Sequence, residues 1–149
     1  MQFTLMSRFR DITVALLRIV AGLLFFQHGA QKLFGWFGGF MEPGGTAELF
    51  SLMGLAGVLE TFGGLLILLG LFTRPVAFVL AGEMAAAYFM AHAPNALWPI
   101  QNGGESAALF AFIFLFFSAN GSGPFSLDRM IAGRNAPPVG VPDAREGVH

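Results

Sequence analysis

The stretch SLMGLAGVLETFGGLLILLGLFTR, residues 51–74, decides how this sequence folds. Residues 52–71 form a nearly unbroken apolar run, long enough to span a bilayer core about 30 Å thick. Glu60 lies close to its middle, where a charged group is rare unless it has a partner or a function. Gly57 and Gly64 share the helical face of Glu60, and small residues on such a face let a neighbouring helix approach closely. We therefore expect Glu60 to point into a helical bundle and not into lipid.

The composition is that of a membrane protein. Of 149 residues, 55% are hydrophobic and only 11% are charged, whereas soluble domains carry about 25% charged residues. The formal net charge of -1 argues against nucleic-acid binding, which needs a basic patch. There is no cysteine, which excludes disulfides, thiolate nucleophiles and thiol relays. Because the sequence also has no haem motif and no dinucleotide fingerprint, a redox role would need a bound quinone, a metal or a partner protein.

The apolar runs predict an all-α integral membrane protein, an antiparallel four-helix bundle. Its transmembrane helices are expected over about residues 11–34, 49–72, 75–92 and 104–119. Only a very short connection at Thr73 to Pro75 separates the second and third helices, which predicts a helical hairpin. The domain would cover residues 1–128, and the polar cytoplasmic tail over residues 129–149 is expected to be disordered.

The first apolar run has an alternative interpretation as a secretory signal peptide. It follows Arg8 and Arg10, and a signal peptide begins in a similar way. Arg18 interrupts the run, however, and no small-residue cleavage site follows cleanly. We therefore interpret it as a retained transmembrane helix.

The distribution of basic residues predicts the orientation of the four helices. With four spans, both termini and the turn at residues 73–75 lie on one side of the membrane. The arginines on that side are Arg8, Arg10, Arg74, Arg129, Arg134 and Arg145. Lys32 falls on the other side, so the positive-inside rule places both termini in the cytoplasm and the chain in a bacterial inner membrane.

Three ionisable residues from different predicted helices form a candidate proton-handling cluster. At about 1.5 Å per residue, Arg18, Glu60 and Glu83 fall at depths that allow them to meet in one layer of the bundle. Two acids and one arginine leave an excess negative charge, so repulsion favours one protonated carboxyl, and such a proton would suit a redox cofactor. The alternative is structural: Arg18 links the helices together, because buried charges find partners.

A second group of polar residues falls near the outer ends of the predicted helices: His28, Lys32, His92 and Glu105. Histidines, an ammonium and an acid around an aromatic mouth suit a quinone head group or proton exchange with the periplasm. The alternative is that they snorkel or cap helix ends, where polar residues are tolerated. A metal site made by His28, His92 and Glu105 is a weaker hypothesis, because their spacing fits no zinc signature, and we predict no metal.

Five segments, in this order, resemble the DoxX family of small four-helix bacterial membrane proteins. They are LLRIVAGLLFFQHGAQKLFG (16–35), ETFGGLLILLGLFTR (60–74), GEMAAAY (82–88), NGGE (102–105) and GPFSLD (123–128), and the resemblance covers about residues 17–128. It implies quinone-linked redox chemistry, because the founding members are the small subunit of a thiosulfate:quinone oxidoreductase and others work with sulfur-transfer and superoxide-detoxifying enzymes. It also implies a recurring polar set, with no role assigned to any one member: Arg18, His28, Lys32, Glu60, Arg74, Glu83 and Glu105.

Two hypotheses about function follow from these observations. In the first, the chain is a quinone-binding subunit of a membrane oxidoreductase system linked to sulfur or oxidative-stress chemistry, and a redox partner protein supplies electrons. In the second, it is a non-catalytic membrane scaffold or assembly subunit whose buried ion pairs fix helix packing and dock a partner. A transporter is less favoured, because four helices without clear inverted repeats leave little room for alternating access. Membrane lipid is an expected partner, while a homo-oligomer and an enzymatic activity of the chain itself stay open.

Overall fold

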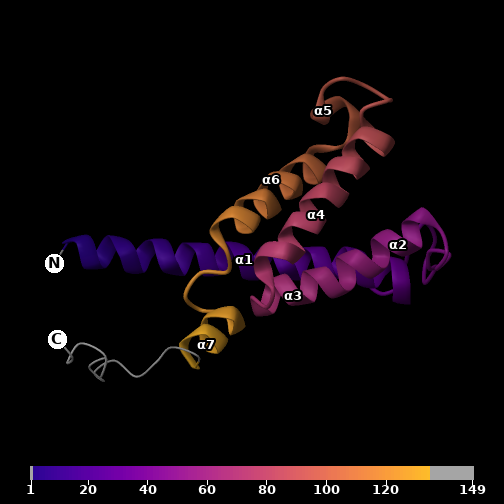
Figure 1. The fold of residues 1–149 in the computed structure, drawn as a ribbon. Coiled ribbons are helices and arrows are strands. Elements are labelled where there is room, and N and C mark those ends of the chain that lie inside the picture. The colour runs from indigo at the N-terminus through magenta and orange to yellow at the C-terminus, as the bar shows by residue number, and fades with distance from the viewer. Residues whose placement is uncertain (1, 135–149) are drawn as a thin grey trace, which may run out of the picture.

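The structure is a computed structural model that describes residues 2–134, and over that range it is all-α with no strand. The elements in chain order are α1 (Gln2–Phe34), α2 (Leu52–Val58), the π-helical segment η1 (Leu59–Gly63), α3 (Gly64–Leu69), α4 (Thr73–Ala87), the π-helical segment η2 (Tyr88–His92), α5 (Pro99–Asn102), α6 (Glu105–Asn120) and α7 (Leu127–Arg134). Since η1 joins α2 to α3 and η2 extends α4 without a break, the described range contains four long helical segments (Figure 1). The prediction of an all-α fold is confirmed.

The long helical segments pair into two hairpins (Figure 1). In the first hairpin α1 packs against α2, η1 and α3, and in the second α4 packs against α6. The hairpins meet near the turn between α3 and α4, and they diverge toward the ends that carry α2 and α5. The fold is therefore held together at one end and opens toward the other.

Glycines set the short distance between α1 and α3. A Cβ atom on Gly22 would lie only 2.8 Å from the carbonyl oxygen of Gly64, and a Cβ on Gly64 would lie 2.5 Å from the backbone nitrogen of Phe26. A real side chain does not fit in either place, so the two backbones touch directly, as at small-residue interfaces in membranes. Gly64 therefore provides the close helix contact that the sequence predicts for this face.

The core lies where the two hairpins meet. Phe25 from α1 contacts Phe114 from α6 with ring centroids 4.7 Å apart and an edge-to-face angle of 72°, a favourable arrangement for two aromatic rings. Both rings are fully buried, and so are Ile67 and Leu80 from α3 and α4. Each of the four long helical segments thus contributes a side chain to one apolar cluster.

The outer surface of the helices is apolar as well. Phe62, Phe78 and Phe112 are 59%, 69% and 72% exposed, and many other large apolar side chains are exposed beside them. Two described helices are long and apolar enough to cross a membrane, Leu52–Leu69 with a mean hydropathy of 2.0 and Thr73–His92 with 1.2. Because apolar patches of this extent are rare on soluble monomers, the surface is suited to lipid as its solvent.

Two segments outside the predicted transmembrane helices, one before the first and one after the last, are also helical. The first helix begins at Gln2 instead of near residue 11, because good helix formers precede the apolar run and extend it toward the N-terminus. The predicted disordered tail instead begins with α7, where the Ser126 hydroxyl accepts a hydrogen bond from the Arg129 backbone N–H (3.2 Å), as an N-cap does. The rest of the predicted tail, residues 135–149, lies outside the described residues.

Candidate functional site

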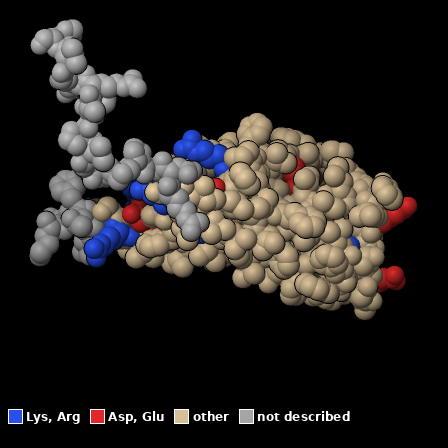
Figure 2. Space-filling view, turned by 60° about the horizontal axis from the view of Figure 1, so that its bottom comes forward, with Lys and Arg blue, Asp and Glu red and all other residues tan. Residues whose placement is uncertain are grey.

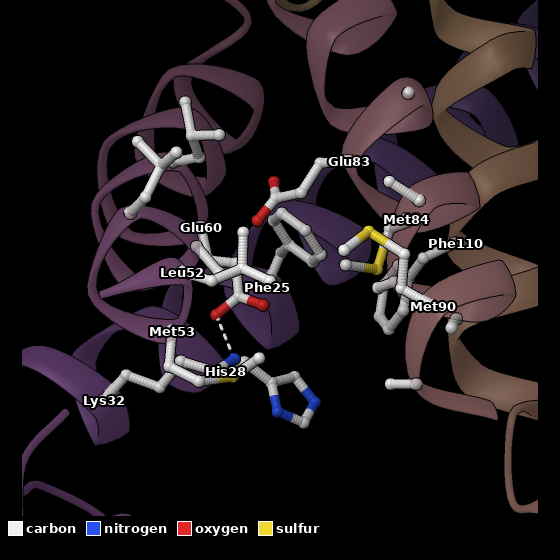
Figure 3. Close-up of a pocket in the computed structure, with 18 of the residues that line it drawn as sticks. Phe25, His28, Lys32, Leu52, Met53, Glu60, Glu83, Met84, Met90 and Phe110 are labelled. Atoms are coloured by element: carbon white, nitrogen blue, oxygen red, sulfur yellow. Dashed lines mark hydrogen bonds and ion pairs between the residues drawn. The ribbon is translucent and has the colours of Figure 1, made fainter. Parts of the chain in front are cut away.

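A cleft of about 580 Å³ lies between the two hairpins. Its walls are mostly apolar and come from both hairpins, with Phe25 from α1, Leu52 from α2, Met84 from α4 and Phe110 from α6 among them (Figure 3). Five ionisable residues also line it: His28, Lys32, Glu60, Glu83 and His92. The cleft therefore combines an apolar space with a few convergent polar groups, which is the usual composition of a small-molecule site.

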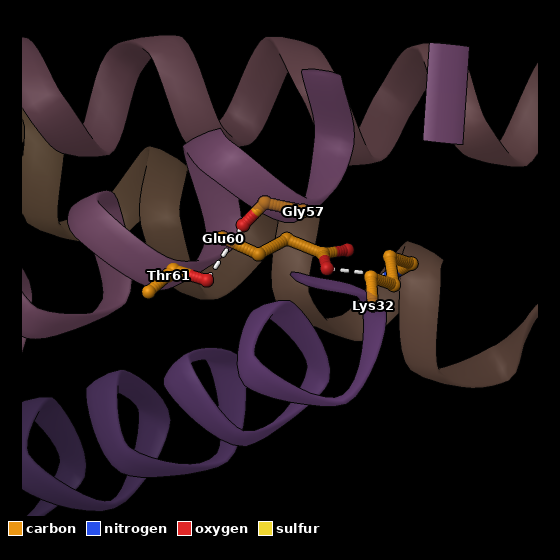
Figure 4. A network of polar contacts seen from close by, with 4 residues as sticks. All are labelled: Lys32, Gly57, Glu60 and Thr61. Atoms are coloured by element: carbon orange, nitrogen blue, oxygen red, sulfur yellow. Dashed lines mark hydrogen bonds and ion pairs between the residues drawn. The ribbon is translucent and has the colours of Figure 1, made fainter. Parts of the chain in front are cut away.

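The strongest polar contact in the cleft is an ion pair between Lys32 and Glu60. The Lys32 Nζ atom lies 2.5 Å from Oε2 of Glu60, and the two side chains are only 14% and 5% exposed. The pair joins the C-terminal part of α1 to η1 (Figure 4). With both charges removed from solvent, each requires the other as its counter-ion.

Glu60 belongs to the π-helical segment η1, in the middle of the second long helix. The Thr61 hydroxyl donates a hydrogen bond to the carbonyl oxygen of Gly57 (2.7 Å), which satisfies a polar group inside the helix (Figure 4). A π-helical turn changes the direction of the side chains that follow it, and such turns are frequent at functional sites. Here the irregular turn carries the carboxylate that faces Lys32.

Glu83 reaches the same cleft from α4, on the opposite hairpin (Figure 3). Both of its carboxyl oxygens are buried and make no hydrogen bond within the described part of the chain. Its charge interacts with those of Glu60 and Lys32. The site thus holds two carboxyl groups for one ammonium, and Glu83 is the group whose polar atoms lack a partner.

Arg18 does not join the two glutamates, so this part of the predicted cluster is wrong. Its guanidinium donates to the carbonyl oxygens of Ser122 (2.5 Å) and Phe125 (2.7 Å), in the segment between α6 and α7. Antiparallel pairing places Arg18 beside Gly70, at the end of α3, whereas Glu60 lies farther along the helix. The cation that meets Glu60 is Lys32.

The contact between Lys32 and Glu60 follows from the antiparallel register of α1 against the second long helix. A Cβ atom on Gly57 would lie 3.0 Å from Cβ of Lys32, so Lys32 lies beside Gly57, one helical turn before Glu60, and its long side chain can reach the carboxylate. The connection between the two helices sets this register, and its path cannot be derived from composition.

The three other predicted residues of the outer group differ in their placement. His28 lines the cleft with its ring centroid 6.5 Å from that of Phe110. His92 also lines it, and its Nδ1 atom is 3.0 Å from the carbonyl oxygen of Asn102. Glu105 is exposed in the first turn of α6 and does not line the cleft, and an acid is favourable there because it faces the positive end of the helix dipole.

Two further features of the site concern ligand chemistry. Met53, Met84 and Met90 line the cleft, and the sequence pattern does not distinguish them because methionine in an apolar helix carries no positional signal. Their flexible side chains adapt to ligands of irregular shape. Over residues 2–134, no group of three histidine or acidic side chains is arranged to hold a metal ion.

Comparison with known proteins identifies relatives over most of the chain. Residues 13–93 match the DoxX family. An uncharacterized protein of Haemophilus influenzae is 42% identical over 126 residues, which cover 83% of this chain and 93% of that protein. Inner membrane protein YqjF of Escherichia coli is 30% identical over 85% of this chain and 97% of its own length.

A more distant relative is the Bacillus subtilis protein named "Putative oxidoreductase CatD", which is 28% identical over 85% of this chain and 92% of its own length. No solved structure matches the chain significantly. The family match covers more than half of the sequence, and the apolar helices agree with it. The chain is therefore a membrane protein of the DoxX family.

Proposed function

We propose that this protein is an inner-membrane quinone-binding subunit of an oxidoreductase system, and that the cleft between its hairpins holds the quinone head group. The observation that carries the proposal is Glu83, a buried carboxyl with no hydrogen-bond partner that lines an apolar cleft beside the Lys32–Glu60 ion pair. Buried polar groups are normally paired, so an unpaired one in a cleft of about 580 Å³ suggests a missing ligand.

The residues of the cleft fit a quinone in both of its parts. A quinone head group presents two carbonyl oxygens, and a protonated Glu83, the Lys32 ammonium and the cleft histidines are potential donors to them. The rim of the cleft is apolar, with Leu55 and Met90 54% and 63% exposed, so a prenyl tail would pass from the cleft into lipid without crossing polar surface.

A bound quinone would supply a carrier of two electrons and two protons. In this proposal the chain binds and orients that carrier, and Glu83 holds a proton at its carboxyl group within the cleft. The Lys32–Glu60 pair keeps the ammonium in place, and the apolar walls exclude water. The chain has no cysteine, so electrons would come from a redox group of a partner protein.

The proposal includes a membrane topology with four spans and both termini in the cytoplasm. The arginine-rich ends of α1, α4 and α7 support this orientation through the positive-inside rule. The name of the Escherichia coli relative supports the inner membrane as the location, and that of the Bacillus subtilis relative supports a redox role. Sulfur or oxidative-stress chemistry is the class of partner reaction that we propose.

The test is retention of quinone by the purified protein. Wild-type protein and the Glu83→Leu variant would be purified in mild detergent, extracted with organic solvent and analysed for quinone, and each would be titrated with decyl-ubiquinone while its melting temperature is followed. We expect the wild type to retain quinone and to be stabilised, and Glu83→Leu to lose both effects. Glu105→Gln is the matched control, because Glu105 lies outside the cleft.

A scaffold subunit is the second candidate function, and the Lys32–Glu60 pair favours it because a buried ion pair can serve to fix the packing of α1 against η1. The same experiment separates the two functions. If the wild type melts cooperatively and yet neither retains quinone nor is stabilised by decyl-ubiquinone, the quinone proposal is overturned. That result would leave the scaffold subunit as the supported function.

A further inference from the structure

A second hollow lies at the opposite end of the fold, where the hairpins meet. It is lined by the N-terminal half of α1, the start of α4, the segment that follows α6, and α7. The charged residues that line it are Arg10, Asp11, Arg74, Asp128 and Arg129. This hollow is separate from the cleft and is much more polar in its lining.

The two acids of the hollow already have partners. Asp128 accepts hydrogen bonds from the backbone N–H groups of Phe72 (2.8 Å) and Thr73 (2.9 Å) at the start of α4. Asp11 lies 3.6 Å from the guanidinium of Arg10. Asp128 is therefore held at the start of α4, while Asp11 makes only a surface contact with Arg10, and neither acid forms an ion pair with Arg74 or Arg129.

Arg74 and Arg129 remain as cations without an ion pair among the residues that the structure describes. Arg74 lies against Gly121, where a Cβ atom would come within 3.2 Å of its Nε atom. Arg74 and Arg129 are both exposed residues that line the hollow, so their donors are open to a ligand. Two arginines around one hollow are suited to a phosphate group, which arginine binds through paired hydrogen bonds.

The surroundings of the hollow combine exposed apolar side chains with basic ones, as at a membrane interface. Phe125, Met130 and Ile131 next to it are exposed by 62%, 64% and 48%. On the face that Figure 2 shows, most basic side chains gather at one end of the molecule, and the opposite end carries acidic groups. A basic hollow with apolar side chains beside it fits a head group at the surface and acyl chains in the membrane.

We propose that this hollow binds the phosphate group of an anionic phospholipid, held by Arg74 and Arg129. The ligand would link α4 to α7, because the two arginines belong to these elements. This site is independent of the quinone cleft, and its ligand has a structural role at the end of the fold where the hairpins are joined.

The experiment compares lipids on the full-length protein in a neutral detergent. The melting temperature is measured while short-chain phosphatidylglycerol, short-chain phosphatidylcholine or glycerol 1-phosphate is added. We expect phosphatidylglycerol to bind and stabilise the wild type, and the Arg74→Gln/Arg129→Gln variant to bind it at least tenfold more weakly. Arg8→Gln is the matched control, an exposed arginine of α1 that does not line the hollow, and its affinity should change by less than twofold.

Three results would overturn the proposal. If Arg8→Gln lost as much affinity as the double variant, the lipid would be attracted diffusely to a basic surface. If phosphatidylcholine stabilised the wild type as much as phosphatidylglycerol does, the hollow would have no preference for an anionic lipid. If glycerol 1-phosphate bound as tightly as phosphatidylglycerol, the hollow would be a site for a free phosphate. If the double glutamine variant does not fold, Arg74→Lys/Arg129→Lys takes its place. The double lysine variant keeps both charges but loses the forked geometry of the guanidinium groups, so we expect its affinity for phosphatidylglycerol to be intermediate. An affinity equal to that of the wild type would contradict the proposed contact between the two arginines and the phosphate.

Discussion

The Lys32 ammonium and the Glu60 carboxylate are in contact at 2.5 Å although they are 28 positions apart in the sequence. The pair is almost completely buried, and it connects α1 to the irregular turn η1. Glu83 lies close enough to both for its charge to interact with theirs. The three groups therefore form one electrostatic unit with two acids and one ammonium, and the His28 imidazole also interacts with Glu60.

This imbalance predicts an asymmetry between two variants. Glu60→Gln leaves Lys32 with Glu83 as a nearby acid, so we expect a loss of about 1 to 2 kcal/mol in the free energy of unfolding. Lys32→Met leaves the two acids without their ammonium, with only the His28 imidazole beside Glu60, and we expect a larger loss of about 3 kcal/mol. The measurement is the free energy of unfolding of each variant in detergent. Equal losses of stability in the two variants would contradict the conclusion that the three groups form one electrostatic unit.

The close contact of Gly29 with Thr61 gives a second prediction. A Cβ atom on Gly29 would lie 2.3 Å from the backbone nitrogen of Thr61, so Gly29→Ala must push α1 away from η1. We expect a loss of about 2 kcal/mol from this overpacking. Because the movement also separates Lys32 from Glu60, quinone retention should fall in the same variant if the quinone proposal holds.

Gly82→Ala is the matched control for the stability loss of Gly29→Ala, and for that readout alone, because Gly82 lines the cleft. Gly82 is also helical, but a Cβ atom there meets nothing within 4 Å. Alanine has the higher helix propensity, so we expect an unchanged or slightly raised stability, by up to about 1 kcal/mol. A similar loss in both variants would show that the effect comes from the substitution itself and not from the contact of α1 with η1.

Asp128 gives a prediction about pH. Burial alone would raise its pKa, but the hydrogen bonds from the backbone N–H groups of Thr73 and Phe72 outweigh burial and lower the pKa below its ordinary value. The unfolded chain then takes up this proton at a higher pH than the folded chain. Its contribution to stability is complete above the ordinary aspartate pKa of about 3.9 and is lost as the pH falls through the lower folded pKa.

The comparison that checks this is wild type against Asp128→Asn. Near pH 7 we expect the variant to be less stable by about 1 kcal/mol, as for loss of a helix cap. The difference should shrink as the pH falls from about 4, where the unfolded chain begins to take up the proton, through the lower pKa of the folded carboxylate, below which Asp128 is as uncharged as asparagine. A difference that stays constant down to pH 3 would show that Asp128 does not act through its charge.

The sequence predicts a large part of this fold from local patterns. The apolar runs locate the long helices, and the glycines around Glu60 predict that its face is packed against another helix. Gly57 and Gly64 are both buried, and so is Glu60. These features depend on residues within a few helical turns of one another, so they can be predicted from the sequence without knowledge of the tertiary structure.

The partner of Glu60 could not be predicted in the same way. Its identity depends on the register between α1 and the second long helix, which the path of residues 35–51 determines. The angle between the hairpins is also a tertiary property. It depends on Phe72, which adopts a left-handed conformation (φ 50°) in the turn before α4, and no composition rule predicts that conformation for phenylalanine.

Arg18 gives the last prediction, because its placement separates a structural role from proton handling. Its guanidinium satisfies the carbonyl oxygens of Ser122 and Phe125, and Arg18 itself is 2% exposed. Arg18→Met leaves both carbonyls without this donor, so we expect a loss of about 3 kcal/mol in the free energy of unfolding. Arg18→Lys should recover part of this loss, because an ammonium can reach one carbonyl. The fraction of Arg18→Met that remains folded should retain quinone as the wild type does, since Arg18 does not line the cleft. Normal stability with loss of quinone would instead place Arg18 with Glu60 and Glu83, as its position in the sequence alone suggests.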